Sequence, residues 1–238
     1  MTILAIDSSG LVASVAIMTE EAMLAEYTVN YKKTHSQTLL PMIDEIVTML
    51  EIDLKNIDAI AIAKGPGSFT GLRIGSATAK GLGLALDKPI IEIPTLDALA
   101  YNVFSLDTVI CPLMDARRNQ VYTGLYAFKE GEFTVLEEQC VVELPEIIDK
   151  VNKLEKRVVF LGDGVDAYKE QIKELVTVPH LFAPSHVAKQ RAGSVGALAF
   201  KYYNENTMKT AMGHVPTYLR LSQAERELAE KQKNESGN

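Results

Sequence analysis

The feature of this chain that most constrains its fold is an order of expected strands and helices that occurs twice. Residues 2–29 contain three short runs rich in Ile, Leu, Val and Ala, which predict three consecutive strands. Residues 34–50 carry apolar residues at helical spacing, a strand is expected at 58–63, and a further helix ends near residue 86. The same order of three strands, helix, strand and helix begins again at residue 108.

The two copies also share their turn chemistry. The first strand of each copy ends in an aspartate, Asp7 or Asp115, and the fourth ends in a Gly-x-Gly turn. Three successive strands followed by a helix and another strand predict a mixed α/β sheet, not a doubly wound sheet of strict βα alternation. Two such βββαβα halves would face each other across a cleft. The chain is therefore expected to divide into residues 1–105, residues 106–221 and a charged, disordered tail at 222–238.

Charge and composition restrict the class of partner and the compartment. The chain has 24 Lys and Arg against 31 Asp and Glu, a net charge of -7, which argues against a surface that alone binds a nucleic-acid backbone. No stretch approaches the roughly 18 apolar residues of a membrane span, and the N-terminus does not resemble a signal peptide. Cys111 and Cys140 lie among hydrophobic residues, which indicates free thiols in a reducing compartment, so we expect a cytoplasmic protein.

Two glycine-containing or serine-containing turns are candidates for binding phosphate or nucleotide. The turn at 7–10 (DSSG) offers a carboxylate, hydroxyls and N–H groups, and the loop at 65–71 (GPGSFTG) precedes a helix, where the helix dipole favours an anion. The alternative is purely structural: a hairpin turn that satisfies its own backbone, and glycines that permit close strand–helix approach. The candidate residues are Asp7, Ser8, Ser9, Gly65, Gly67, Ser68, Asp115, Gly162 and Gly164.

Two helices of the first half have unusual surfaces. The helix after the GPGSFTG loop is thin because it contains several glycines and alanines, although each interior glycine costs about 1 kcal/mol relative to alanine. The helix at 34–50 has an apolar arc that covers about half of its circumference, wider than one core face requires. Either the pair forms a protein–protein surface or it belongs to a thick internal core.

The sequence carries no recognisable catalytic or metal set. Its four histidines are isolated, no G-x-S-x-G nucleophile elbow is present, and Cys111 lies in the middle of an expected strand. Arg117 and Arg118 follow Asp115 and could bind a phosphate or carboxylate, or form a solvated hairpin with a local ion pair. The residues alone do not decide whether Arg117, Arg118 or Arg220 contacts RNA.

Several segments together resemble the bacterial TsaB (YeaZ) family. They are ILAIDSS, SVAI, HSQTLLPMI, AIAKGPGSFTGLRIG, AKGLGLAL, MDARRNQVY and PTYLR, and the resemblance extends from Thr2 to about Arg220. It implies two RNase H-like halves of the actin/Hsp70/sugar-kinase (ASKHA) type. It also implies a role in making N6-threonylcarbamoyladenosine at position 37 of tRNAs that read codons beginning with A.

In that family the resemblance implies a division of labour. The TsaD subunit transfers the threonylcarbamoyl group, TsaB is its non-catalytic partner, and the ATPase TsaE joins them; TsaB alone forms a homodimer. The metal-binding His-x-x-x-His of the TsaD paralogue falls on Thr95 and Leu99 here, so no metal and no catalytic residue are expected. No cofactor is expected in this subunit, and ATP or ADP would act at the level of the complex. Tentative interface residues are Leu39, Ile43, Ile46, Leu72, Gly75 and Ala79.

Three other functions stay open on the sequence. The first is a small ATPase or kinase of the same fold that uses Asp7, Asp115 and the second Gly-x-Gly turn. The second is an M22-type peptidase, which the missing histidine pair disfavours. The third is an interaction module unrelated to tRNA, because only the resemblance points to tRNA.

Overall fold

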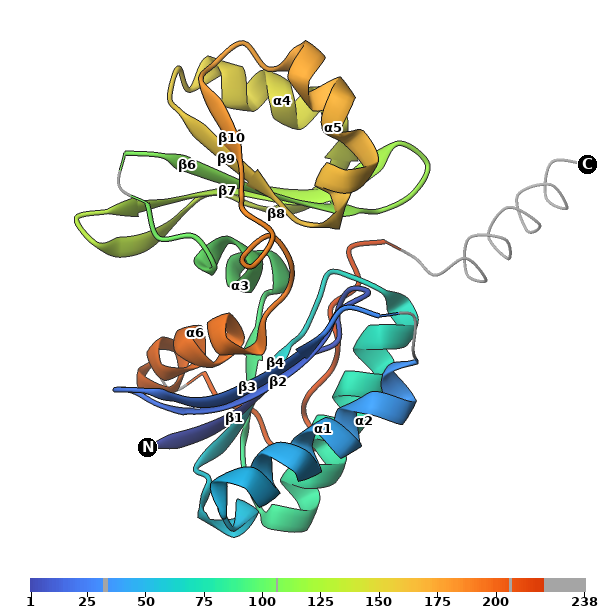
Figure 1. The fold of residues 1–238 in the computed structure, drawn as a ribbon, viewed down its shortest axis with the longest axis vertical. Coiled ribbons are helices and arrows are strands. Elements are labelled where there is room, and N and C mark those ends of the chain that lie inside the picture. The colour runs from blue at the N-terminus through green and yellow to red at the C-terminus, as the bar shows by residue number, and fades with distance from the viewer. Residues whose placement is uncertain (32–33, 106, 206, 221–238) are drawn as a thin grey trace, which may run out of the picture.

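The computed structural model describes residues 1–31, 34–105, 107–205 and 207–220, so the tail expected at 222–238 lies outside the described residues. The chain forms two five-stranded mixed sheets (Figure 1). The first half contains β1 (Thr2–Asp7), β2 (Ala13–Thr19), β3 (Met23–Val29), α1 (His35–Leu50), β4 (Ala59–Ala63), α2 (Phe69–Leu86), β5 (Ile90–Ile93) and α3 (Thr95–Tyr101). The second contains β6 (Val109–Asp115), β7 (Gln120–Lys129), β8 (Glu132–Glu143), α4 (Leu144–Lys153), β9 (Val158–Leu161), α5 (Asp163–Leu175), β10 (His180–Phe182) and α6 (Ala192–Asn204).

The two sheets have the same topology. Their strand orders are β3-β2-β1-β4-β5 and, read in the same sense, β8-β7-β6-β9-β10. In each sheet the first three strands pair antiparallel, and the first strand pairs parallel with the fourth, which pairs parallel with the fifth. The predicted duplication is therefore confirmed, and each copy is longer than expected, with the order βββαβαβα.

The central strands explain why the pattern was legible. Residues 3–6 of β1 and all of β4 are almost completely buried, and both strands consist of continuous Ile, Leu and Ala. A strand covered on both faces has no need of alternating polar residues. β3, at the sheet edge, instead alternates loosely between exposed and partly buried positions.

The helices form layers, and α3 and α6 lie between the two sheets (Figure 1). α1 and α2 cover the outer face of the first sheet, and α4 and α5 cover the outer face of the second. The inner helices exchange sides. α6, from the end of the second copy, packs on the first sheet through residues such as Val195 and Leu198, whereas α3 packs Leu96 and Leu99 on the second sheet.

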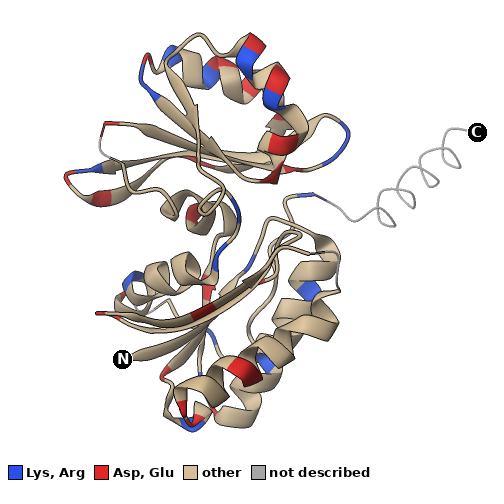
Figure 2. Cartoon of the chain, viewed as in Figure 1, with Lys and Arg blue, Asp and Glu red and all other residues tan. Residues whose placement is uncertain are grey.

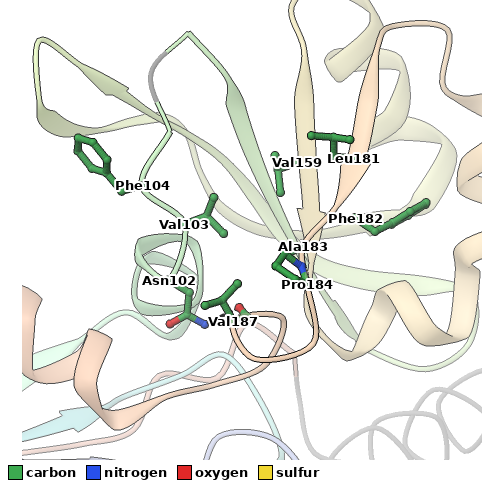
Figure 3. Close-up of a pocket in the computed structure, with 9 residues that line it drawn as sticks. All are labelled: Asn102, Val103, Phe104, Val159, Leu181, Phe182, Ala183, Pro184 and Val187. Carbon is green, nitrogen blue, oxygen red and sulfur yellow. Dashed lines mark hydrogen bonds between the residues drawn. The ribbon is translucent and has the colours of Figure 1, made fainter.

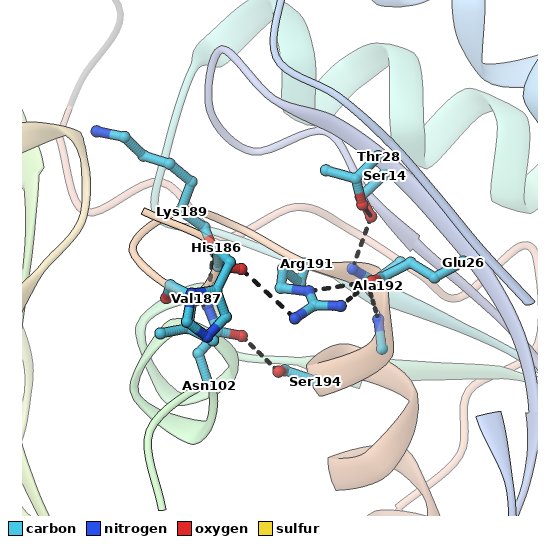
Figure 4. Close-up of polar contacts among 11 residues, drawn as sticks. Ser14, Glu26, Thr28, Asn102, His186, Val187, Lys189, Arg191, Ala192 and Ser194 are labelled. Atoms are coloured by element: carbon cyan, nitrogen blue, oxygen red, sulfur yellow. Dashed lines mark hydrogen bonds and ion pairs between the residues drawn. The ribbon is translucent and has the colours of Figure 1, made fainter. Parts of the chain in front are cut away.

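Polar contacts fix the start of α6 against the first sheet (Figure 4). The Glu26 carboxylate, on β3, accepts hydrogen bonds from the Arg191 guanidinium and from the backbone N–H of Gly193 at 2.8 Å. The backbone N–H of Ala192 donates to Ser14 Oγ at 2.9 Å. These acceptors satisfy N–H groups of the first turn, which have no partner within the helix.

Three local expectations differ from the structure. β10 was not predicted, because three residues after Pro179 give no periodicity to read. α6 begins at Ala192 and not near Lys189, since residues before it are held in extended contacts. Thr95, expected to cap α3, is its first residue; Pro94 occupies the cap position, and the Thr95 hydroxyl instead accepts a hydrogen bond from the Gly65 N–H at 3.0 Å. Among the described residues, no helix is long and apolar enough to span a membrane.

Candidate functional site

The turn that follows β1 is closed by its own hydrogen bonds. Asp7 Oδ1 accepts hydrogen bonds from the Ser9 backbone N–H at 2.9 Å and from Ser9 Oγ at 2.6 Å. The Ser8 hydroxyl donates to the carbonyl oxygen of Gly71 at 2.9 Å, and all three side chains are buried. Burial raises the pKa of Asp7 to about 6, against the opposing effect of the Ser9 hydrogen bonds.

The GPGSFTG loop packs directly onto this turn. The Ser68 backbone N–H donates to the Ser9 carbonyl oxygen at 2.7 Å. A Cβ atom on Gly67 would overlap that same oxygen, and one on Gly71 would overlap the Ser8 carbonyl oxygen. The glycines therefore permit backbone-to-backbone contact that any side chain would prevent. The structure brings the six predicted residues of the first half together, as proximity of the two turns requires.

A C-terminal strap, residues 209–220, covers the other side of the loop. Its Thr217 N–H donates to the Lys64 carbonyl oxygen at 2.7 Å, and a Cβ on Gly65 would overlap the Thr217 carbonyl oxygen. Further along, the Tyr218 ring lies 4.6 Å from the ring of Phe69, measured between centroids. The donors of Gly65, Ser68 and Gly71 are all used inside the chain. These contacts favour the structural interpretation of the glycines, and phosphate binding here stays a prediction.

The predicted residues of the second half form a separate cluster. Gly162 has φ of 102° and its N–H donates to the Ala188 carbonyl oxygen at 2.7 Å; a Cβ there would overlap the Leu113 carbonyl oxygen. A Cβ on Gly164 would also lie within 2.9 Å of that oxygen. Asp115 is exposed, and its Oδ1 accepts hydrogen bonds from the Arg117 N–H at 2.8 Å and from the Tyr168 hydroxyl at 3.3 Å.

The segment 188–192 connects the two clusters, and sequence reasoning missed it. Ala188 binds Gly162, and the buried Gln190 amide lies where a Cβ on Gly10 would approach its Nε2 to 2.8 Å. Asp163, beside Gly162, was also missed; burial raises its pKa, which Lys189 opposes. A Gly-x-Gly turn gave the only signal for this region. The nine predicted residues therefore form two closed turns joined by this segment.

The positions aligned with metal ligands of TsaD have other roles here. The Thr95 hydroxyl binds the Gly65 N–H, and Leu99 lies in an apolar cluster with about 1% of its surface exposed. Neither side chain offers an imidazole or carboxylate. In the ranges the structure describes, no group of three or more His, Cys, Asp or Glu residues is arranged to hold a metal ion.

The six interface residues expected on α1 and α2 require a correction. All of them are buried inside the chain: Leu39, Ile43, Ile46, Leu72, Gly75 and Ala79. A Cβ on Gly75 would meet Ser8 and Ile62, so this glycine faces the first sheet and not a partner. The wide apolar arc of α1 is explained by its packing on the sheet and on α2. The exposed apolar positions are others, including Leu40 and Met49 on α1 and Leu84 on α2.

Two features lie at the junction of the halves. Asp97, on α3, accepts hydrogen bonds from Tyr126 of β7 and Tyr202 of α6, at 2.9 Å and 3.5 Å. A cavity of about 270 Å³ opens where α3 ends, between Phe104 and the last strand of the second sheet (Figure 3). Its lining is mostly apolar and includes Val103, Val159 and Phe182, but none of the nine predicted phosphate-binding residues.

This architecture defines the class of the protein. Two equivalent RNase H-like halves with facing inner helices make an α/β protein of the actin/Hsp70/sugar-kinase (ASKHA) type, as expected from the sequence. A solved structure of the ethanolamine utilization protein EutJ from Carboxydothermus hydrogenoformans shares this fold, with 10% identity, a TM-score of 0.50, and coverage of 83% of this chain and 89% of that one.

Sequence comparison gives the family. The chain belongs to the TsaB (YeaZ) family: it is 34% identical over 233 residues to the tRNA threonylcarbamoyladenosine biosynthesis protein TsaB of Bacillus subtilis, covering 98% of this chain and 100% of that protein. It is 31% identical over 235 residues to Escherichia coli TsaB, with the same two coverages. Residues 22–228 match the family model of TsaD, the tRNA N6-adenosine threonylcarbamoyltransferase.

Solved structures agree with the sequence match. YeaZ from Pseudomonas aeruginosa has a TM-score of 0.76 and 27% identity, over 92% of this chain and 99% of that one. A second structure with a TM-score of 0.76 and 26% identity, over the same shares of the two chains, is described as an uncharacterized protein with similarity to peptidase YEAZ from the same species. The TsaB family, its fold and its kinship with TsaD, all expected from the sequence, are confirmed.

Proposed function

We propose that this chain is the non-catalytic subunit that binds TsaD and supports transfer of the threonylcarbamoyl group to adenosine 37 of tRNAs that read ANN codons. The match to TsaB proteins named for this biosynthesis, over nearly the full chain, supports it. TsaD supplies the metal and the transfer chemistry, TsaE is the ATPase of the complex, and tRNA is engaged through the complex. The subunit works in the cytoplasm without a membrane, and alone it pairs with a second copy.

The observation that carries the non-catalytic role is the chemistry at the two aligned ligand positions. A catalytic metal of the TsaD type needs imidazole ligands at the start of α3, and here the Thr95 hydroxyl holds the GPGSFTG loop while Leu99 is in the core. Replacing either residue by histidine would break a packing contact before it made a ligand. We therefore assign no catalytic residue and no metal to this chain.

The turns also argue against a nucleotide-using enzyme as the alternative. Kinases and ATPases of this fold class need open turns that approach phosphates with free N–H groups. Here Ser68 and Gly162 direct their N–H groups to carbonyl oxygens of the same chain. We propose that the subunit needs no cofactor, and that ATP or ADP acts at the level of the complex.

The partner surface is assigned to the outer face of α1 and α2. Ala77, Gly81 and Leu84 follow one another at a spacing of four and three residues, which places them on one face of α2. All three are exposed, and a Cβ on Gly81 would meet nothing within 4 Å. Small residues let a helix of another chain approach closely, and Leu84 and Leu40 supply apolar area; they are 58% and 55% exposed.

Reconstitution tests the proposal. TsaD and TsaE of the same organism are mixed with unmodified tRNA and the threonylcarbamoyl donor, with and without this chain, and N6-threonylcarbamoyladenosine is measured by mass spectrometry. We expect product only when the chain is present, and no product from the chain alone. Depletion in cells should lower the modified nucleoside in bulk tRNA. An unchanged level after depletion, or ATP turnover and peptide cleavage by the isolated chain, would refute the assignment.

A further inference from the structure

The turn between β6 and β7 displays two arginines on a backbone that is costly to form. Arg117, Arg118 and Asn119 have φ angles of 62°, 56° and 60°, three successive residues in the left-handed region. Each such residue costs on the order of 1 kcal/mol without glycine. Both arginines are exposed. A conformation that is expensive and points guanidinium groups into solvent suggests that their position matters.

The turn is braced from several sides. The Ala116 N–H donates to the Gln120 carbonyl oxygen at 3.0 Å, and the Gln120 N–H donates to the Arg117 carbonyl oxygen at 3.2 Å. The Arg220 guanidinium, at the end of the C-terminal strap, donates to the Ala116 carbonyl oxygen. Arg220 is thus a structural tie, while Arg117 and Arg118 point outward from a fixed backbone.

The strap connects this turn to a second basic position. Two residues before Arg220, the Tyr218 ring contacts Phe69, and the Arg73 guanidinium lies 4.0 Å from the centre of the Phe69 ring. Arg73 is exposed, and Tyr218 keeps 37% of its surface in solvent. The turn after β6, the end of the strap and the start of α2 lie on one side of the molecule, and Figure 2 shows basic residues in all three.

The charge of this edge is not neutralised within the chain. In the part of the chain that the structure describes, Arg73, Arg117 and Arg118 form no ion pair. Asp115 is the carboxylate beside the turn, and its Oδ1 is engaged by the Arg117 backbone N–H and the Tyr168 hydroxyl. On a chain of net charge -7, three unpaired guanidinium groups beside an exposed ring form a local exception.

We propose that Arg73, Arg117, Arg118 and Tyr218 form an RNA-binding edge, in which the arginines contact phosphates and Tyr218 stacks with an unpaired base. Guanidinium groups match phosphate geometry, and aromatic rings beside them are typical of single-stranded RNA sites. The inference rests on the proposed function, which brings tRNA to the complex. It changes the expectation that the partners alone provide the RNA surface. An acidic protein segment would use the arginines but leave Tyr218 without a role.

The test measures tRNA binding as a function of salt. The complex of this chain with TsaD is titrated into fluorescent, unmodified tRNA reading an ANN codon, at several salt concentrations. For Arg117→Ala/Arg118→Ala we expect at least about tenfold weaker binding and a log–log salt slope reduced by nearly 2, since each lost phosphate contact removes about 0.9. Arg117→Lys/Arg118→Lys keeps both charges and should keep the slope.

A charge-matched control is available at the other end of β6. Lys156 and Arg157 are exposed and precede β9, whose first residue pairs with the first residue of β6, whereas the arginine turn follows the last. Lys156→Ala/Arg157→Ala removes the same net charge and should leave affinity and slope nearly unchanged. Equal losses in the two double variants would mean that only net charge matters, and would overturn the RNA-binding edge.

The remaining outcomes separate the two proposals. If wild-type chain does not bind TsaD in size-exclusion chromatography, the proposed function fails, and tRNA binding by the chain alone still tests the arginines. If the complex forms but Arg117→Ala/Arg118→Ala changes neither affinity nor slope, the RNA-binding edge alone is refuted. A variant that loses polyglutamate binding and retains tRNA binding would also refute it, and would identify an acidic protein segment as the ligand.

Discussion

The Tyr126 hydroxyl donates a hydrogen bond of 2.9 Å to Asp97 Oδ1 and so joins a strand of the second half to a helix of the first. Asp97 is 7% exposed, and burial raises its pKa from 3.8 to about 6, assisted by the nearby Glu138 charge and opposed by the tyrosine hydrogen bonds. The carboxyl group therefore titrates between the two halves of the chain.

This pKa predicts a pH-dependent stability with a defined sign. The folded chain binds a proton at Asp97 more tightly than the unfolded chain, so the contribution is fully present below about pH 4 and is lost as the pH rises through about 6. Two pKa units correspond to at most about 3 kcal/mol. Between pH 4 and pH 7, Asp97→Asn should therefore gain about 1 to 3 kcal/mol of unfolding free energy relative to wild type, measured by urea denaturation.

The comparison needs a carboxylate without this environment. Asp44 lies on the exposed side of α1, and Asp44→Asn should shift the unfolding free energy little and equally at both pH values. If Asp97→Asn shows the same pH dependence as wild type, the buried carboxyl does not titrate in this window.

Two glycines of the same helix separate packing from helix propensity. Alanine at either Gly71 or Gly81 of α2 gains about 1 kcal/mol of propensity. A Cβ on Gly71 would overlap the Ser8 carbonyl oxygen, whereas one on Gly81 meets nothing. We expect Gly81→Ala to be neutral or stabilising and Gly71→Ala to lose about 2 kcal/mol or more, because overpacking a backbone contact typically costs 1 to 3 kcal/mol. Equal effects in denaturant titration would contradict the close approach of turn and helix.

The two cysteines should differ sharply in reactivity. Cys111 is fully buried, its sulfur lies 3.6 Å from Thr123 Oγ1, and burial raises the pKa of its thiol to about 12. Cys140 is only half-buried. Because the thiolate is the reactive form, iodoacetamide at pH 8 should label Cys140 slowly and leave Cys111 unmodified until denaturant is added. Peptide mass spectrometry reads both sites, and rapid native labelling of Cys111 would be inconsistent with its packing.

The partner surface of α2 can be tested without disturbing the core. Gly81→Glu and Leu84→Glu place a charge on the outer face, and a charge buried at an interface is costly unless it is paired. We expect at least a tenfold weaker complex with TsaD, about 1.4 kcal/mol, in analytical size exclusion and titration calorimetry. Gly75→Glu is unsuitable, because that position faces Ser8 and Ile62 and the variant should unfold.

A control for these variants is Leu181→Glu. Leu181 is 54% exposed, lies on the last strand of the second half and is remote in sequence from α2. It should leave the complex with TsaD intact. Unchanged binding by Gly81→Glu and Leu84→Glu, with folded proteins, would remove α2 from the interface.

The sequence was informative where one interaction dominates. The fully apolar β4 and the helical periodicity of α1 report burial directly, so element order and duplication could be predicted. It was less informative where long-range contacts decide. The apolar arc of α1 has the same appearance whether it meets a partner or α2, and only the structure shows that Ile46 and Ala79 share one core.

The site was predictable as positions but not as contacts. The aspartate and glycine turns could be located, yet Gln190 and Asp163 carry no local signal, because their environment is made by residues distant in sequence. Similarly, nothing near Thr95 reveals that its hydroxyl is bound to Gly65, 30 residues earlier.

The exchange of α3 and α6 between the sheets has a consequence for folding. Each half leaves the inner face of its sheet bare until the other half supplies a helix, so neither can complete a hydrophobic core alone. The last helix of the chain is also required to cover its first strand. Folding must then be a single cooperative event that awaits residue 204, and the two sheets are fixed in place like a bolted joint, where related kinases are built to hinge.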